Sequence, residues 1–100
     1  MQENIHEILK NHRSEIDHLD DEIVSLIALR LGVIDRVAKI KCEKNIEPRL
    51  QDRVAEVIKR NRSMANILGA DADLIEQLYT QIVENAIIRE TVYIEQHKKS

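Results

Sequence analysis

Several charged side chains stand in or beside apolar stripes, at positions where hydrophobic residues are expected. Arg30 falls in the middle of a series with apolar residues at alternating steps of three and four, from Ile16 to Ile40. Glu90 interrupts a second series in the same way. Three further cations lie at the edges of apolar stripes, namely Arg13, Lys41 and Arg53. Burying a charge is costly unless it is paired, so these residues require an explanation.

The excess of cations over Glu90 predicts an anion-binding pocket between helices. One buried acid cannot neutralise three or four basic groups, so a bound anion would complete the charge balance. Arginine suits a two-pronged grip on a carboxylate. A structural interpretation stays open: Arg30 and Glu90 form a buried ion pair that fixes helix register, while Lys41 and Arg53 reach water along their stems.

These side chains are carried by a predicted all-α chain of three helices, which forms a single domain over residues 1–100. The first helix is expected from about residue 4 to Glu43, and the segment 44–48 breaks it because proline disfavours helix in the preceding residue. The second is expected over 49–67, with Gly69 as its C-cap. The third is expected over 74–97, with Asp71 or Asp73 as its N-cap.

The length of the first helix predicts an intertwined homodimer. At ~1.5 Å per residue its forty residues span roughly 60 Å, whereas a compact chain of this size has a radius of gyration of only ~13 Å. The two shorter helices cannot cover the whole apolar seam. A second copy of the chain is the simplest cover for the rest.

Composition excludes several classes of function. A single cysteine, Cys42, rules out an intramolecular disulfide or a cysteine zinc cluster. Two Glu-x-x-His matches, Glu3–His6 and Glu15–His18, fall on one predicted helix, so no metal is expected. The net charge of −3 and the lack of aromatic residues among the basic ones argue against nucleic-acid binding. No stretch is apolar enough for a membrane span or a signal peptide, which favours a cytoplasmic protein.

No phosphate loop, dinucleotide fingerprint or Ser/His/Asp arrangement is present either. Any catalysis therefore has to proceed without a nucleophile and without a cofactor. Taken together, the ordered set Arg13-x-x-Ile16-Asp17-x-Leu19-Asp20, Leu26-Ile27-x-x-Arg30, Lys41, Arg53, Leu78-Tyr79 and Glu90 resembles the all-helical chorismate mutase family. The resemblance extends from about residue 9 to residue 95. It implies an interlaced dimer of three-helix chains, in agreement with the length argument.

The resemblance also implies roles for individual residues. Arg30, and Arg13 of the partner chain, would grip the carboxylates of a small dianionic substrate; Lys41 would donate to its ether oxygen. Arg53 would contact the substrate near its ring or a carboxylate, and Glu90 would be the second ether-oxygen ligand. Glu90 must be protonated to donate, and an ordinary glutamate titrates near ~4.3, so kcat/KM is expected to rise toward acidic pH.

Two positions leave the substrate open between chorismate and isochorismate. Many of these mutases have a glutamate for the ring hydroxyl where this chain has Val54, and some have a hydroxyl residue where it has Ala86. Isochorismate pyruvate-lyases, which share the fold and yield salicylate and pyruvate, resemble the chain at Arg53-Val54-Ala55, Arg62-x-x-Ala65 and Gly69-x-Asp71. Chorismate mutase is the first expectation and the lyase the second. A non-catalytic helical dimer with a regulatory role is the third.

Overall fold

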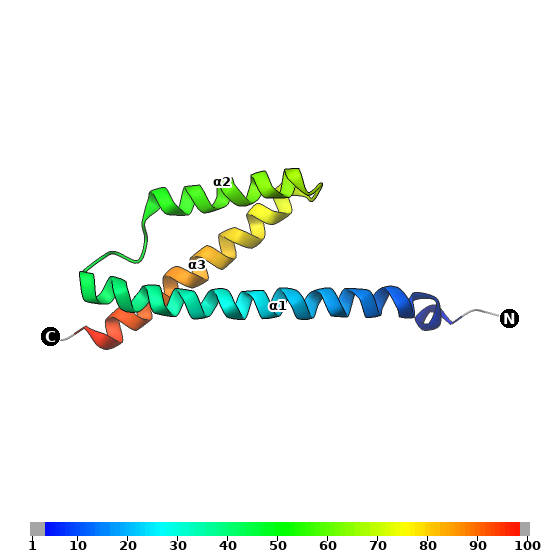
Figure 1. Ribbon diagram of the computed structural model, residues 1–100, viewed down its shortest axis with the longest axis horizontal. Coiled ribbons are helices and arrows are strands. Elements are labelled where there is room, and N and C mark those ends of the chain that lie inside the picture. Colours follow the sequence, from blue (N-terminus) through cyan, green and yellow to red (C-terminus); the bar gives the residue numbers. More distant parts are fainter. Residues whose placement is uncertain (1–3, 99–100) are drawn as a thin grey trace. The chain divides into compact units, whose positions relative to one another are not determined.

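The computed structural model describes residues 4–98 and contains three α-helices in this range (Figure 1). They are α1 (Ile5–Lys44), α2 (Gln51–Ile67) and α3 (Ala72–His97). The chain divides into two compact units, one ending at Gly32 and one beginning at Val33. The described residues contain no helix long and apolar enough to cross a membrane. The predicted all-α fold is confirmed, with helix boundaries within about two residues of those expected.

The end of α1 is set by a residue that the sequence analysis did not single out. Asn45 has a left-handed backbone with φ 55°, and the Ile46 N–H donates to the Lys41 carbonyl at 2.9 Å. This is the geometry in which a left-handed residue closes a helix, with asparagine in the place more often held by glycine. The helix thus ends at Lys44, four residues before Pro48, and residues 45–50 form the connector to α2.

An aspartate begins α3, as predicted, whereas the C-cap of α2 is Leu68, and Gly69, which was predicted there, lies one residue beyond it. Gly69 has φ 71°; its N–H donates to the Asn66 carbonyl, and the Ala70 N–H donates to the Ala65 carbonyl at 2.8 Å. The Asp71 side chain then accepts hydrogen bonds from the backbone N–H groups of Asp73 and Leu74. Asp71 is therefore the N-cap of α3, which decides between the two candidates and lets the helix begin at Ala72.

Within the second unit, α2 and α3 form an antiparallel hairpin with a small-residue core. Val57 and Ala65 are the buried residues of α2, and Val83 and Ala86 are the buried apolar residues of α3. Small side chains let the two backbones approach closely. Glu90 is buried on the same face of α3 as Val83 and Ala86, so this face carries a buried charged residue beside two buried apolar ones.

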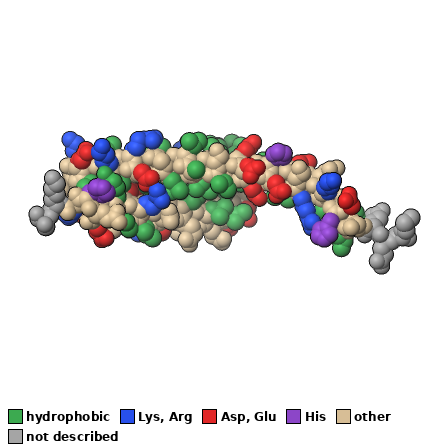
Figure 2. Space-filling model, turned by 90° about the horizontal axis from the view of Figure 1, so that it is seen from below, with side chains coloured by type: hydrophobic (Ala, Val, Ile, Leu, Met, Phe, Trp, Pro, Cys, Tyr) green, Lys and Arg blue, Asp and Glu red, His purple; other side chains and the backbone are tan. Residues whose placement is uncertain are grey.

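In the first unit, the part of α1 from Ile5 to Leu29 has every residue exposed. Its apolar seam is open: Ile16, Leu19, Ile23 and Leu26 keep 54%, 57%, 53% and 65% of their surface accessible. Figure 2 shows hydrophobic side chains lying open among charged ones on the face it displays. A contiguous apolar stripe of this kind marks an interaction surface.

Candidate active site

The centre of the candidate site is a buried ion pair between Lys41 and Glu90. Lys41 Nζ lies 2.6 Å from Glu90 Oε1, and the two side chains are only 13% and 5% exposed. Glu90 Oε1 nevertheless lacks a directed hydrogen bond, so the contact is a close charge pair with poor hydrogen-bond geometry. The pair joins the last turn of α1 to α3, and places a cation and a carboxyl group side by side in a water-poor environment.

A second contact of Lys41 reaches the connector. Its Nζ donates to the Pro48 carbonyl oxygen at 2.8 Å, while its own carbonyl accepts from Ile46. Lys41 therefore makes two contacts with the connector that leads to α2. The sequence analysis missed the Pro48 partner because backbone carbonyls leave no signature in the residue pattern.

Within the second unit, the ion-pair partner of Glu90 is Lys41. Arg30, which the structural interpretation pairs with Glu90, belongs to the first unit. Arg30 is half-buried, and its Nη1 atom is buried without a hydrogen-bond partner among the described residues. A buried donor left unsatisfied is costly, and guanidinium donors match carboxylate oxygens best. Arg30 thus retains a free donor suited to an anion.

The remaining predicted site residues on α2 and α3 differ in how exposed they are. Arg53 is exposed in the first turn of α2, and its Nη1 contacts the Glu56 carboxylate one turn later. Val54 is half-buried, and Ala86 on α3 is buried at 4% exposure. Ala86 and Glu90 are one helical turn apart, so both belong to the buried face of α3. Only Nη1 of Arg53 contacts Glu56, so the rest of its guanidinium group is open to a ligand.

Arg13 lies on the exposed part of α1, where its Nη1 is 2.8 Å from His6 Nδ1. Arg13 and Arg30 share one continuous helix and stand seventeen residues apart in the sequence, which corresponds to roughly 25 Å along the axis. Two residues so far apart on one rigid helix cannot bind the same small molecule within one chain.

Two surface ion pairs strengthen the second unit around this site. Arg49 in the connector binds Glu84 on α3 through two hydrogen bonds of 2.8 and 2.6 Å. The hydrogen bonds from Arg49 hold the pKa of Glu84 below its ordinary value, and the same contact raises the pKa of Arg49. On α1, Asp35 accepts from Arg89, the residue before Glu90, at 2.8 and 2.9 Å. None of these four residues interrupts an apolar stripe, so the sequence analysis did not find them.

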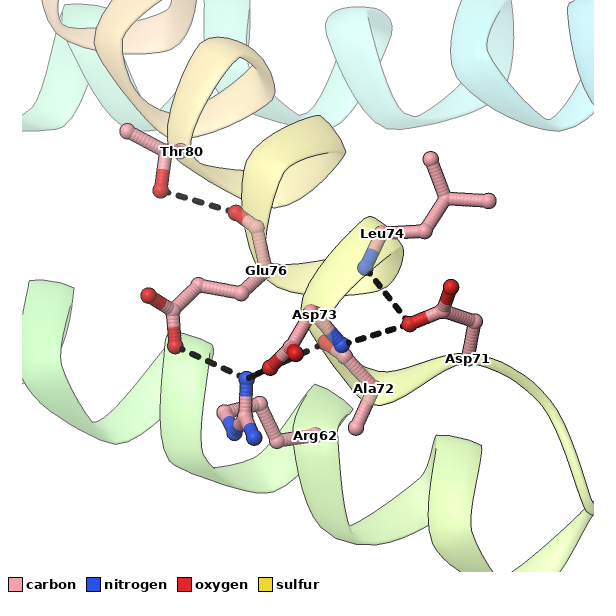
Figure 3. A network of polar contacts seen from close by, with 7 residues as sticks. All are labelled: Arg62, Asp71, Ala72, Asp73, Leu74, Glu76 and Thr80. Atoms are coloured by element: carbon pink, nitrogen blue, oxygen red, sulfur yellow. Dashed lines mark hydrogen bonds and ion pairs between the residues drawn. The ribbon is translucent and has the colours of Figure 1, made fainter.

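The turn between α2 and α3 is stabilised by four residues at which the chain resembles the lyases, namely Arg62, Ala65, Gly69 and Asp71. Figure 3 shows Arg62 and Asp71 there. Arg62 Nη1 contacts Asp73 Oδ1 at 2.9 Å, Glu76 Oε1 at 3.2 Å and the Ala72 carbonyl at 3.3 Å. The hydrogen bond to Asp73 raises the pKa of Arg62. Ala65 is buried, Gly69 follows the C-cap of α2, and Asp71 is the N-cap of α3. Each of these residues is explained by its role in the turn, so this part of the resemblance carries no information on the substrate.

A small cavity lies beside Lys41, under the connector. Its volume is about 150 Å³, and its lining includes Lys41, Cys42, Glu47, Pro48 and Lys98. Sites for small organic ligands usually measure ~300–1,000 Å³, so this cavity alone is too small for one. Among residues 4–98, no group of three His, Cys, Asp or Glu side chains is placed to hold a metal ion, and Glu3 of the Glu3–His6 match lies outside the described residues.

Comparison with known proteins gives concordant matches. A sequence model of the family described as chorismate mutase type II matches residues 12–91. The chain is 32% identical over 87 residues to the T-protein of Haemophilus influenzae, a match that covers 87% of this chain and 23% of that protein. It is 27% identical over 78 residues to the T-protein of Enterobacter agglomerans, covering 78% and 21%. The chain thus spans less than a quarter of the length of these relatives.

Proposed function

Because this chain belongs to the chorismate mutase type II family, we propose that it converts chorismate to prephenate. The buried Lys41–Glu90 pair carries the proposal, since it presents two potential hydrogen-bond donors in a site that excludes water. The reaction breaks a C–O bond and forms a C–C bond within one molecule. It needs no nucleophile, no cofactor and no added reactant, which agrees with the residues at hand.

The proposed mechanism combines orientation and electrostatics. Lys41 donates to the ether oxygen, on which negative charge develops as the C–O bond breaks, and Glu90 donates to the same oxygen when it is protonated. Arg30 binds a substrate carboxylate through its guanidinium group, whose Nη1 atom has no partner among the described residues. Arg53 contacts the substrate near its ring or a carboxylate with the part of its guanidinium group that Glu56 does not engage. These groups hold the reactive conformation and stabilise its charge.

We propose further that the active form is a homodimer built on the apolar seam of α1. The exposure of Ile16, Leu19, Ile23 and Leu26 supports it, because such a stripe is stable in water only when covered. The distance argument supports a shared site: Arg13 is too far from Arg30 along α1 to join it in one chain. In the dimer, Arg13 of the second copy supplies the second carboxylate contact.

Isochorismate pyruvate-lyase activity is the second candidate, and two side chains favour it. Val54 has no acceptor for the ring hydroxyl of chorismate, and Ala86 has no hydroxyl to offer. Both are at least half-buried, so water replaces these contacts poorly. The lyase products would be salicylate and pyruvate. The description of the matching family puts the mutase first.

The experiment that tests the proposal offers purified protein chorismate and isochorismate in separate assays. Loss of chorismate absorbance with formation of prephenate supports the mutase, and salicylate fluorescence from isochorismate supports the lyase. Turnover of neither substrate favours the third candidate, a non-catalytic helical dimer with a regulatory role. Arg30→Ala separates the third candidate from the first two, because a catalytic Arg30 is required for turnover while the folded dimer persists without it.

A further inference from the structure

We infer that, in the proposed dimer, His12 of one copy accepts a hydrogen bond from Arg30 of the other and so positions that guanidinium for the substrate. Two polar residues flank the apolar part of the α1 seam from Ile16 to Leu26, with His12 before it and Arg30 after it. Arg30 stands seven residues after Ile23, and His12 stands seven residues before Leu19. Both positions therefore belong to the same seam, which repeats every seven residues.

An antiparallel pairing of two α1 helices brings these two interruptions together. If Leu19 of one copy lies opposite Ile23 of the other, then Ile16 lies opposite Leu26, and His12 lies opposite Arg30. The contact contains this His–Arg layer twice, once at each end of an apolar centre, as two-fold symmetry requires. Polar residues at seam positions are the usual device that fixes the register of paired helices.

Other registers leave the polar residues without a match. A shift by one seven-residue repeat places Arg30 opposite Ile5 or Leu19, where no acceptor exists. A parallel pairing in register places Arg30 opposite Arg30, which sets two cations against each other. Only the antiparallel register centred near Asp21 gives each guanidinium a seam partner that accepts a hydrogen bond.

The chemistry of the two side chains fits this contact. Arg30 Nη1 is buried and has no hydrogen-bond partner among the described residues, and His12 is exposed on its own chain. A neutral imidazole has one acceptor nitrogen. The same kind of contact already occurs on α1, where Arg13 Nη1 lies 2.8 Å from His6 Nδ1. One donor bound by His12 leaves the rest of the guanidinium fork for a carboxylate.

The test compares His12→Glu with the matched control His18→Glu. Both variants add the same charge to the same exposed stretch of α1, and His18 lies outside the seam. Because a carboxylate binds a guanidinium more strongly than an imidazole does, and because the dimer contains the contact twice, His12→Glu should lower the dimer dissociation constant on the order of ten-fold at low salt. His18→Glu should leave that constant near the wild-type value. Sedimentation equilibrium without substrate measures both.

Kinetics give a second measure of the same contact. A glutamate on Arg30 competes with the substrate carboxylate, so KM should rise about ten-fold or more in His12→Glu and stay unchanged in His18→Glu. The inference rests on the proposed dimer. A wild-type chain that stays monomeric contradicts the dimer itself. If the wild type is dimeric but His12→Glu dimerises no more tightly than His18→Glu, the dimer stands and the His12–Arg30 contact is overturned.

Discussion

Lys41 is bound on two sides: its Nζ lies 2.6 Å from Glu90 Oε1 on α3 and donates to the Pro48 carbonyl at 2.8 Å. One ammonium group thus ties the end of α1 to both the connector and α3. An ammonium group has three N–H donors, so Lys41 can donate one hydrogen bond to a ligand while both of these contacts persist. The same side chain therefore serves stability in the free protein and, under the proposed mechanism, catalysis in the complex.

Replacing Lys41 by methionine is expected to reduce both properties. The change leaves the buried Glu90 carboxylate without its cation, which should lower the free energy of unfolding by about 3 kcal/mol. Chorismate turnover should fall by at least a hundred-fold, because the donor to the ether oxygen is lost. Urea denaturation and initial rates measure the two effects. Lys39→Met, an exposed lysine on the same helix, should change neither; an equal effect of both variants would remove the special role of Lys41.

Glu90→Gln is expected to flatten the pH profile of turnover. A carboxyl group donates a hydrogen bond only when it is protonated, so kcat/KM of the wild type should rise as the pH falls and decrease as the pH rises. Glutamine donates at every pH. Initial rates between roughly pH 4 and 8 measure the profile. Glu95→Gln, on the exposed side of α3, should keep the wild-type slope; a slope that persists in Glu90→Gln excludes Glu90 as the donor.

Val54→Glu is expected to move substrate preference toward chorismate. The new carboxylate supplies an acceptor for the ring hydroxyl that chorismate carries, and isochorismate has its hydroxyl elsewhere. Sites that hydrogen-bond a substrate hydroxyl discriminate strongly, so the ratio of kcat/KM for the two substrates should change by about ten-fold or more. Val54→Leu, which adds no acceptor, is the control. An unchanged ratio in Val54→Glu would place this side chain away from the ring.

The Arg49–Glu84 contact should give the stability a component that depends on pH. Arg49 holds the pKa of Glu84 below its ordinary 4.5, so the folded state favours the charged carboxylate. The resulting stabilisation is complete above the unfolded value and is lost as the pH falls through the folded pKa. Glu84→Gln should thus be less stable than the wild type at pH 7 and equal to it in strong acid. Urea titrations across this range measure the difference.

The Arg49→Met background provides the control for that experiment. Without the guanidinium, Glu84→Gln should have little effect on stability at any pH, because no partner favours the charged form. A pH-dependent loss that survives in this background would assign it to another group. The size of the effect is expected to be small, since both side chains are exposed to solvent.

The helices could be predicted from the sequence because their signals are local. Gly69 and Asp71 act within a few residues of their own positions, and the apolar steps from Ile16 to Ile40 indicate one long helix by themselves. The end of α1 was predicted at nearly the right residue for a partly wrong reason: the left-handed Asn45 closes the helix, and Pro48 comes later. Local interactions of this kind can be inferred from the residue types and their spacing.

The partners in the site were less predictable. The burial of Glu90 followed from its place in an apolar stripe, whereas its pairing with Lys41 did not, because that contact depends on how the last turns of α1 and α3 are rotated about their axes. A periodic pattern gives the face of a helix and not the side chain that it meets.

The open stretch of α1 has a consequence for folding. From Ile5 to Leu29 the helix buries little of its side chains within the chain, whereas most helical stability in proteins comes from packing of an apolar face. Its helical order then depends on association, so that forming this part of the helix and finding a second copy become one equilibrium. The midpoint of thermal unfolding should therefore rise with protein concentration, as in obligate dimers, and dilution alone should melt this half of α1.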